Sequence, residues 1–254
     1  MRLKRAYFAG AILVSVMPAA MADVVDGRVA QLAATVTIDD WGNTFDFTTD
    51  GSVRNEGGGT YSYAGSGTGA DWDFDWALRA NADPFIAGAL TFVNTTSLTK
   101  NFNVVLSLPI IQEAGTVNET GELSLTLSDS DNSGSADLAL NQWHGLINPL
   151  SGSPVLDMPL LGGSVFNCSG GPGCATSLFP LVSSQQHGSA DHAGNPVDSI
   201  GIHLNFDLSP GDTVVFDTRY EIAAVPVPAA SVLFMSGLVG LFGVLRRKSH
   251  FTGK

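Results

Sequence analysis

The sequence predicts an all-β fold: a two-sheet antiparallel β-sandwich of jelly-roll-like type, with a signal-peptide helix before it and a transmembrane helix after it. Apolar and polar residues alternate along many short segments, which is the pattern of half-buried strands. Turn residues separate these segments about every 8–12 residues, and no helical pattern of about 10–15 residues lies between them. Abundant Gly (29 of 254 residues) and a charged fraction of 14% suit an extracellular β protein better than a helical enzyme.

Roughly ten short strands are expected, and the clearest of them lie in the middle of the chain. The segment DWDFDWAL (71–78) places its acidic residues on one face of a strand and its aromatic residues on the other. Segments 86–94 and 101–110 are expected to pair as a hairpin, because a short polar turn joins them. Segments 121–128 and 136–143 are expected to form a second hairpin in the same way.

The remaining strands flank this region. Two of them are expected within 198–224, on either side of the strong turn signal SPGD. Earlier strands are expected at 29–38 and 44–48. The Pro- and Gly-rich segment 148–174 is expected to be a long loop within one domain, not a domain boundary.

The N-terminus reads as an export signal over residues 1–22. Basic residues open it, an apolar stretch of eleven residues follows at 6–16, and Ala20-Met21-Ala22 forms an A-x-A cleavage site. The alternative is a buried N-terminal helix, which explains this order of features less well. Mature protein is therefore expected to start at Asp23, and residues 23–224 are expected to form the sandwich domain.

The two cysteines fit an oxidising compartment outside the cytoplasm. Cys168 and Cys174 enclose SGGPG, whose glycines permit a tight path, so a structural disulfide is expected. A metal site made of two thiolates is the weaker interpretation, because zinc normally takes four ligands. A catalytic dithiol is also weaker, because such pairs prefer two intervening residues.

The C-terminus combines a proline pair, an apolar run and a basic tail. Residues 229–245 carry no charge and are long enough for a short membrane span. Arg246, Arg247 and Lys248 follow at once, and basic residues stay on the cytoplasmic side. A core helix is the alternative, but the run is apolar all round and has no polar face.

Together these features resemble the PEP-CTERM sorting signal of Gram-negative bacteria, in its VPxPA-type form. The box is Val225, Pro226, Val227, Pro228 and Ala229, and the resemblance covers roughly residues 225–248. It implies an exosortase at the inner membrane and the secretion machinery as partners. It also implies a protein that is tethered to the membrane during sorting and then reaches the cell surface or the extracellular space. Such proteins are often encoded in bacteria that make extracellular polysaccharide and biofilm.

The charge distribution limits the partners of the body. Residues 23–221 hold 24 acidic and five basic side chains, a net charge of −19, whereas the whole chain has −12. A body this acidic repels phosphate backbones, so no nucleic-acid partner is expected. It is compatible with divalent cations.

One acidic loop matches half of a calcium-binding motif. In DSDNSGSAD (129–137), Asp129, Asp131 and Ser133 stand at positions 1, 3 and 5, and Asp137 stands at position 9. Leu140 occupies position 12, where an EF-hand has a bidentate Glu, and the flanks resemble strands. The loop therefore predicts either a looser calcium site or a solvated turn. No cofactor other than calcium is expected.

No catalytic motif is evident, so the protein is not expected to be an enzyme. A structural or interaction role at the cell surface is the first interpretation. The alternative is a carbohydrate-binding module, with calcium as a candidate cofactor, that stacks sugars on Trp41 and Trp143. Both tryptophans border turns, and exposure is expected for them. A glycoside-active enzyme is a third and weaker interpretation.

Overall fold

The computed structural model describes residues 32–38, 41–81, 84–113, 116–151, 156–187 and 197–225. The described strands are β1 (Ala33–Ile38), β2 (Trp41–Asp46), β3 (Gly51–Gly57), β4 (Thr60–Thr68), β5 (Trp72–Asn81), β6 (Phe85–Asn94), β7 (Lys100–Glu113), β8 (Val117–Ser128), β9 (Ser135–Ile147), β10 (Leu156–Ser169), β11 (Ala175–His187), β12 (Val197–Leu208) and β13 (Thr213–Ala224). A short 3₁₀ helix covers Pro149–Ser151. None of the described segments is a helix long and apolar enough to cross a bilayer.

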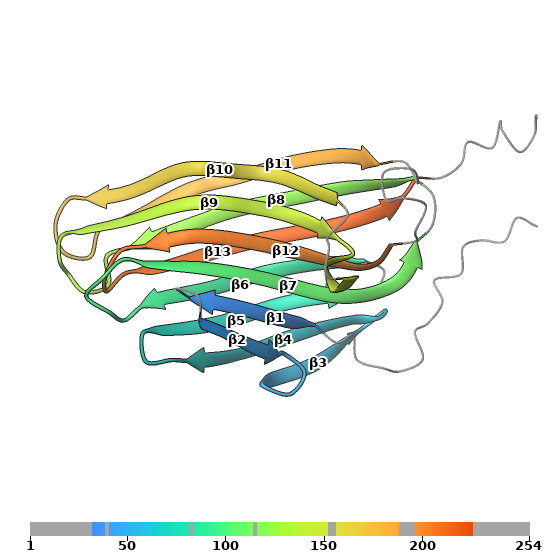
Figure 1. Ribbon diagram of the computed structural model, residues 1–254, viewed down its shortest axis with the longest axis horizontal. Helices are drawn as coiled ribbons and strands as arrows, with labels where there is room; N and C mark the ends of the chain where they lie inside the picture. Colours follow the sequence, from blue (N-terminus) through green and yellow to red (C-terminus); the bar gives the residue numbers. More distant parts are fainter. Residues whose placement is uncertain are drawn as a thin grey trace, which may run out of the picture.

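The strands form two antiparallel sheets that pack face to face, which confirms the β-sandwich (Figure 1). The six-stranded sheet has the order β10-β9-β12-β7-β1-β2, and the seven-stranded sheet has the order β11-β8-β13-β6-β5-β4-β3. Burial alternates along the strands as the sequence pattern requires. In β5, for example, Trp72, Phe74 and Trp76 are buried, while Asp75 is exposed.

The core is one continuous cluster with aromatic rings at its centre. Phe74 and Phe92 of the seven-stranded sheet stack with ring centroids 4.7 Å apart, and Phe102 and Phe206 of the six-stranded sheet stack at 5.0 Å. Phe92 meets Phe206 edge-on at 5.2 Å, so the rings connect the two sheets.

Both predicted hairpins are wrong. β6 and β8 belong to the seven-stranded sheet, whereas β7 and β9, which follow them, belong to the six-stranded sheet. The connecting segments 95–99 and 129–134 therefore cross between the sheets. A period of two fixes which side chains face the core, but it is the same whether the next strand pairs in the same sheet or packs against it from the other sheet. The SPGD turn also crosses, from β12 to β13.

The long loop predicted at 148–174 is also wrong, because most of it is the 14-residue strand β10. β10 and β11 are the outer strands of their sheets on one side of the sandwich. Each contains a proline where the pairing register shifts: Pro159 in β10 and Pro180 in β11. An edge strand tolerates proline because one row of its backbone groups needs no partner strand.

Candidate cation site

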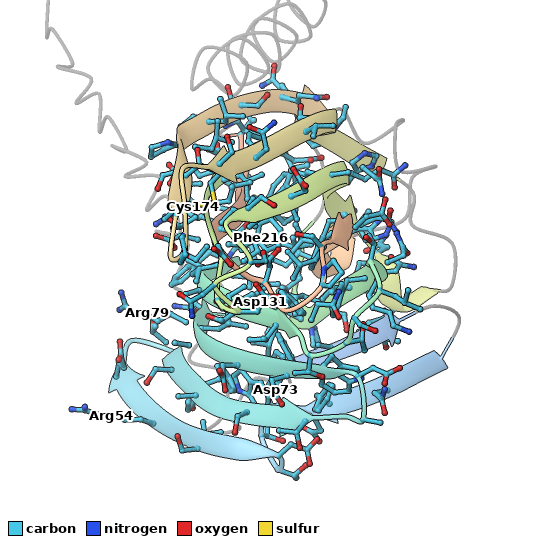
Figure 2. The ribbon with its side chains drawn as sticks, turned by 90° about the vertical axis from the view of Figure 1, so that its left-hand side faces the viewer. Arg54, Asp73, Arg79, Asp131, Cys174 and Phe216 are labelled. Atoms are coloured by element: carbon cyan, nitrogen blue, oxygen red, sulfur yellow. A yellow bond between two sulfur atoms is a disulfide. The ribbon has the colours of Figure 1, made fainter. Side chains whose placement is uncertain are left out.

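Four connections between the sheets meet at one end of the sandwich, which we call the four-loop end. They are residues 95–99, 129–134, 170–174 and 209–212. This end lies on the left in Figure 1, and Figure 2 looks onto it, with Asp131 and Cys174 labelled. The end brings together residues that are more than 100 positions apart in the sequence, as in the Asn94–Ser209 hydrogen bond.

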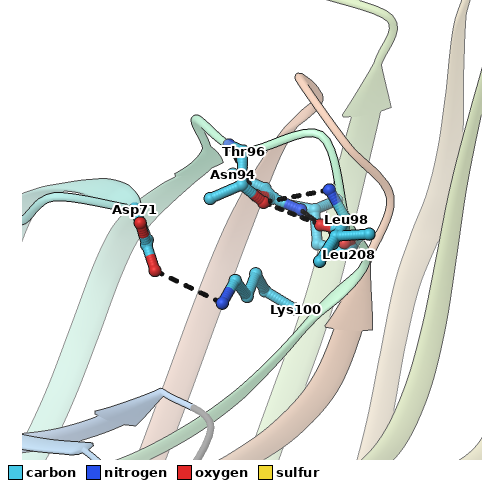
Figure 3. A network of polar contacts seen from close by, with 6 residues as sticks. All are labelled: Asp71, Asn94, Thr96, Leu98, Lys100 and Leu208. Carbon is cyan, nitrogen blue, oxygen red and sulfur yellow. Dashed lines mark hydrogen bonds and ion pairs between the residues drawn. The ribbon is translucent and has the colours of Figure 1, made fainter.

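Asn94 fastens two of these connections to each other (Figure 3). Its side chain is fully buried; Nδ2 donates to the carbonyl oxygens of Leu98 (2.8 Å) and Leu208 (2.9 Å), and Oδ1 accepts from the Thr96 amide (3.0 Å). The Asn94 backbone N–H also donates to the carbonyl of Asp212 at 3.0 Å. Asn94 therefore fixes the backbone that carries Asp212.

Asp129 holds the 129–134 connection in its turn. Its carboxylate is almost fully buried and accepts the backbone N–H groups of Ser133 (3.1 Å) and Gly134 (3.0 Å). Asn132 and Gly134 have φ values of 61° and 97°, a conformation that Asn and Gly tolerate best. The Asp-Asn-Gly composition of this loop therefore explains its shape.

The predicted disulfide between Cys168 and Cys174 is confirmed. It closes the 170–174 connection against the same aspartate: the Gly173 N–H donates to Asp129 Oδ2 at 3.1 Å, and the Asp129 N–H donates to the Cys174 carbonyl at 2.9 Å. Burial alone would raise the pKa of Asp129, but the Gly134 and Gly173 amides, the Asp131 side chain and the Ser133 amide outweigh it and lower this pKa below its ordinary value. Asp129 is therefore a stable carboxylate.

Asp212 enters the site from the SPGD turn. Its side chain is fully buried; one oxygen accepts the Ser209 hydroxyl, while Oδ1 accepts no hydrogen bond within the described part of the chain. Burial raises the pKa of Asp212, and the negative charges of Asp131 and Asp129 raise it further, whereas the Ser209 hydroxyl and the Ser130 backbone act in the opposite direction. The ionised form of Asp212 therefore lacks the compensation that Asp129 has.

Asp129, Asp131 and Asp212 form a cluster, with one carboxylate oxygen of each within 4.8 Å of those of the other two. Asp131 lies against the Gly211 backbone, where an added Cβ would come 2.5 Å from Asp131 Oδ2. Within the described ranges no Lys, Arg or His forms an ion pair with any of the three. An all-oxygen, triply acidic cluster of this kind can hold a hard cation.

The structure thus brings together two of the four predicted calcium ligands, Asp129 and Asp131, and adds Asp212. Ser133 donates its hydroxyl to the Ser135 carbonyl at 2.9 Å. Asp137 is exposed and lies outside the cluster; its backbone N–H donates to the Ser209 hydroxyl oxygen at 2.7 Å. Asp212 carried no spacing signal in the sequence, because only the crossing of β12 to β13 places it beside residues some 80 positions earlier.

The expected exposure of Trp143 is wrong. Its side chain is 0% exposed and donates from Nε1 to Thr218 Oγ1 at 2.8 Å. The sequence predicts a strand that ends at Trp143, but β9 continues to Ile147. Trp41 begins β2, and its side chain lies outside the described ones. Among the aromatic side chains that are described, every one is buried or partly buried.

The other predicted site residues belong to the two ends of the chain. Val225 is the last described residue, and its N–H donates to the Thr116 carbonyl at 2.9 Å. The rest lie outside the described residues: Ala20, Ala22, Pro226, Val227, Pro228, Ala229, Arg246, Arg247 and Lys248.

Comparisons with known proteins add no relationship. No protein-family model matches the chain, and no curated protein matches it. One solved structure aligned with it is a chain of the T13 viral particle of IBDV, an icosahedral virus, with 9% sequence identity and a TM-score of 0.10. The alignment covers 85% of this chain and 62% of that chain, so this chain spans less than two thirds of the viral one. A likeness at that level carries no argument about function.

Proposed function

We propose that this protein is an exported β-sandwich that an exosortase delivers to the cell surface or extracellular matrix, where it has a structural or interaction role linked to extracellular polysaccharide and biofilm. The observation that carries the proposal is where the folded body stops. β13 ends at Ala224, and the sorting box begins at the next residue. The last strand therefore ends where the box begins, and Val225 is still hydrogen-bonded to Thr116 of the sandwich.

The position of β13 supports a boundary between the sandwich and the tail. It lies between β8 and β6 and pairs with β8 along its whole length, up to the Ala224–Val117 pair. The two prolines of the box lack the N–H that a continuing strand would need. β13 runs from the four-loop end to the opposite end of the sandwich (Figure 1). While the protein is tethered, the four-loop end would thus lie farther from the membrane than the box does. The difference would be the length of a 12-residue strand, about 40 Å.

We further infer that the sandwich is of jelly-roll type. Strands β6 to β13 make four adjacent positions in each sheet, β11-β8-β13-β6 in one and β10-β9-β12-β7 in the other. Each pair of sequence neighbours β6/β7, β8/β9, β10/β11 and β12/β13 then occupies matching positions in the two sheets. This is the arrangement of a double-sheet, two-Greek-key roll, and β1 to β5 extend it on one side.

Carbohydrate binding is the second candidate function, and the packing gives it less support. Sugar recognition by stacking needs exposed aromatic rings. Trp72, Trp76 and Trp143 are 6%, 2% and 0% exposed. A structural or interaction role, which depends on shape, charge and attachment, fits this surface better than sugar binding by stacking on tryptophan. No catalytic role is proposed.

The sorting proposal is tested by two truncations of the full chain in its host. A chain that ends at Val225 keeps the whole described sandwich and loses the tail, whereas a matched control that ends at Lys248 keeps the box, the apolar run and the basic tail. We expect the first to accumulate in the medium or the periplasm and the second to reach the surface like the full chain. Unchanged surface attachment of the chain that ends at Val225 would contradict the proposal.

A further inference from the structure

We propose that Asp129, Asp131 and Asp212 bind one calcium ion, which links the β8–β9 and β12–β13 connections at the four-loop end. This site is independent of the sorting tail and goes beyond the proposed function. It also differs from the site that the loop motif alone predicts, because Asp212 replaces Asp137 as a ligand.

The spacing of the three carboxylates fits one shared ion. Oxygens that coordinate the same calcium at about 2.3–2.6 Å are at most about 5.2 Å apart. Ligand oxygens of the three aspartates lie within 4.8 Å of one another, so the ion needs no rearrangement of the backbone. Asp131 is exposed, which leaves room for water to complete the coordination.

The buried oxygen of Asp212 is the independent sign of a missing ligand. A buried carboxylate oxygen without a hydrogen bond is costly, because it has lost water and has no donor at hydrogen-bond distance among the described residues. Two other carboxylates beside it increase the cost when all three are ionised. Within the described residues no basic side chain offsets this charge, whereas a divalent cation would offset two of the three charges.

The donor chemistry selects a hard cation. All three ligands are carboxylates, and the neighbouring sulfur atoms are held in the Cys168–Cys174 disulfide and cannot act as thiolates. Calcium accepts irregular geometry and mixed protein and water ligands, while magnesium requires a near-ideal octahedron. A site with three carboxylates and open water positions belongs in the affinity range of extracellular modules, a Kd of about 10⁻⁴–10⁻³ M.

Bound calcium would join parts of the fold that hydrogen bonds already bring close. Asp129 contacts the disulfide loop through Gly173, and the Asp212 backbone contacts Asn94. One ion would therefore link two of the four crossings directly, and the other two through these hydrogen bonds. Such a link would form only where calcium reaches millimolar levels, so the exported protein would be stiffer than the protein before export.

The test uses the purified protein, stripped with EDTA and titrated with calcium chloride at constant ionic strength. We expect a binding heat with a Kd of about 10⁻⁴–10⁻³ M and a rise in Tm of about 3–10 °C at 10 mM calcium. The variant Asp212→Asn keeps the shape of the side chain and removes its charge. It should lose the rise in Tm, and its metal-free Tm should equal or exceed that of the unchanged protein.

The matched control is Asp137→Asn, which removes an exposed carboxylate of the same loop motif outside the cluster. It should keep the full rise in Tm. Asp131→Asn, at an exposed position of the same loop, should lose the rise like Asp212→Asn. The proposal is overturned by no heat and no rise in Tm at 10 mM calcium, by an equal rise with magnesium, or by an Asp212→Asn variant that responds like the unchanged protein.

Discussion

Asn94 joins two of the connections at the four-loop end through its side chain. It is fully buried and uses its amide for the carbonyls of Leu98, Leu208 and Ser209, and its oxygen for Thr96. Neither an apolar nor an acidic side chain can replace both halves of this pattern. These bonds were not visible in the sequence, where Asn94 only ends a strand before a polar turn.

The first prediction follows from those bonds. Asn94→Ala should lower the free energy of unfolding by about 2–4 kcal/mol, because buried carbonyl groups lose their donor and a small cavity remains. Asn94→Asp should cost at least as much, because it places a carboxylate against carbonyl oxygens. Urea unfolding measures both, and Asn118→Ala, at an exposed position of β8, is the control, with an expected change within about 0.5 kcal/mol. Asn94→Ala with the stability of the control would contradict this role.

Tyr63 predicts how stability depends on alkaline pH. Burial, together with the charges of Tyr61 and Asp46, raises the pKa of Tyr63 from 10.0 to about 12. Below pH 10 the phenol is protonated in both the folded and the unfolded chain, so it adds no pH dependence. Between pH 10 and 12 the unfolded chain releases this proton and the folded chain keeps it, so the free energy of unfolding falls as pH rises.

Tyr63→Phe isolates this effect from the other tyrosines. The stability difference between the unchanged protein and the variant should shrink or reverse in sign as pH rises from about 9 to about 11.5, because only the unchanged protein pays for keeping a buried phenol protonated. Chemical denaturation at a series of pH values measures it. A difference that stays constant across this range would show that Tyr63 titrates alike in both states.

At the scale of elements, the sequence predicted strands better than their partners. The alternation in 71–78 and the turn signal SPGD correspond to β5 and to the β12–β13 crossing. β10 and β11 escaped detection because prolines and glycines interrupt their pattern, and an edge position tolerates both. The pairing of the strands could not be predicted, because the alternation of apolar and polar residues is the same whether two consecutive strands lie in one sheet or in two.

The candidate cation site, too, could be predicted only in part from the sequence. Asp129 and Asp131 are close in sequence, and the loop motif identified them. Asp212 joins them only through the crossing of β12 to β13, which no local pattern encodes. Asp137 fits the motif by spacing, but β9 begins at Ser135 and carries its side chain out of the turn. Motif spacing can identify ligand residues within one loop, but it cannot identify ligand residues that other loops contribute.

The disulfide loop gives a prediction at this scale. Replacing both Cys168 and Cys174 with Ala should lower the free energy of unfolding by about 2 kcal/mol, the chain-entropy value for so short a loop. It should also weaken calcium binding, because Gly173 no longer holds Asp129 in place. Calorimetry of the double variant measures both effects, and the unchanged protein under reducing conditions is the control. Equal calcium affinity in the variant and the oxidised protein would show that the disulfide does not position the calcium ligands.

At the scale of the whole molecule, the two ends of the sandwich have different roles in this account. β13 carries the chain from the acidic cluster at Asp212 to the sorting box that begins at Val225. In the two proposals, delivery would depend on one end and cation binding on the other, so each should be changeable without the other. A protein that ends at Val225 should therefore keep the calcium response of the full chain while losing its place at the surface.

The central claim is that a folded body lies between two delivery signals, and we propose in addition that the exosortase cleaves the chain within the box. The most direct measurement of both is the intact mass of the protein taken from the cell surface. We expect a chain that starts at Asp23, ends within the box at 225–229 and contains one disulfide. A surface form that still begins at Met1, or that retains the basic tail through Lys254, would contradict the account.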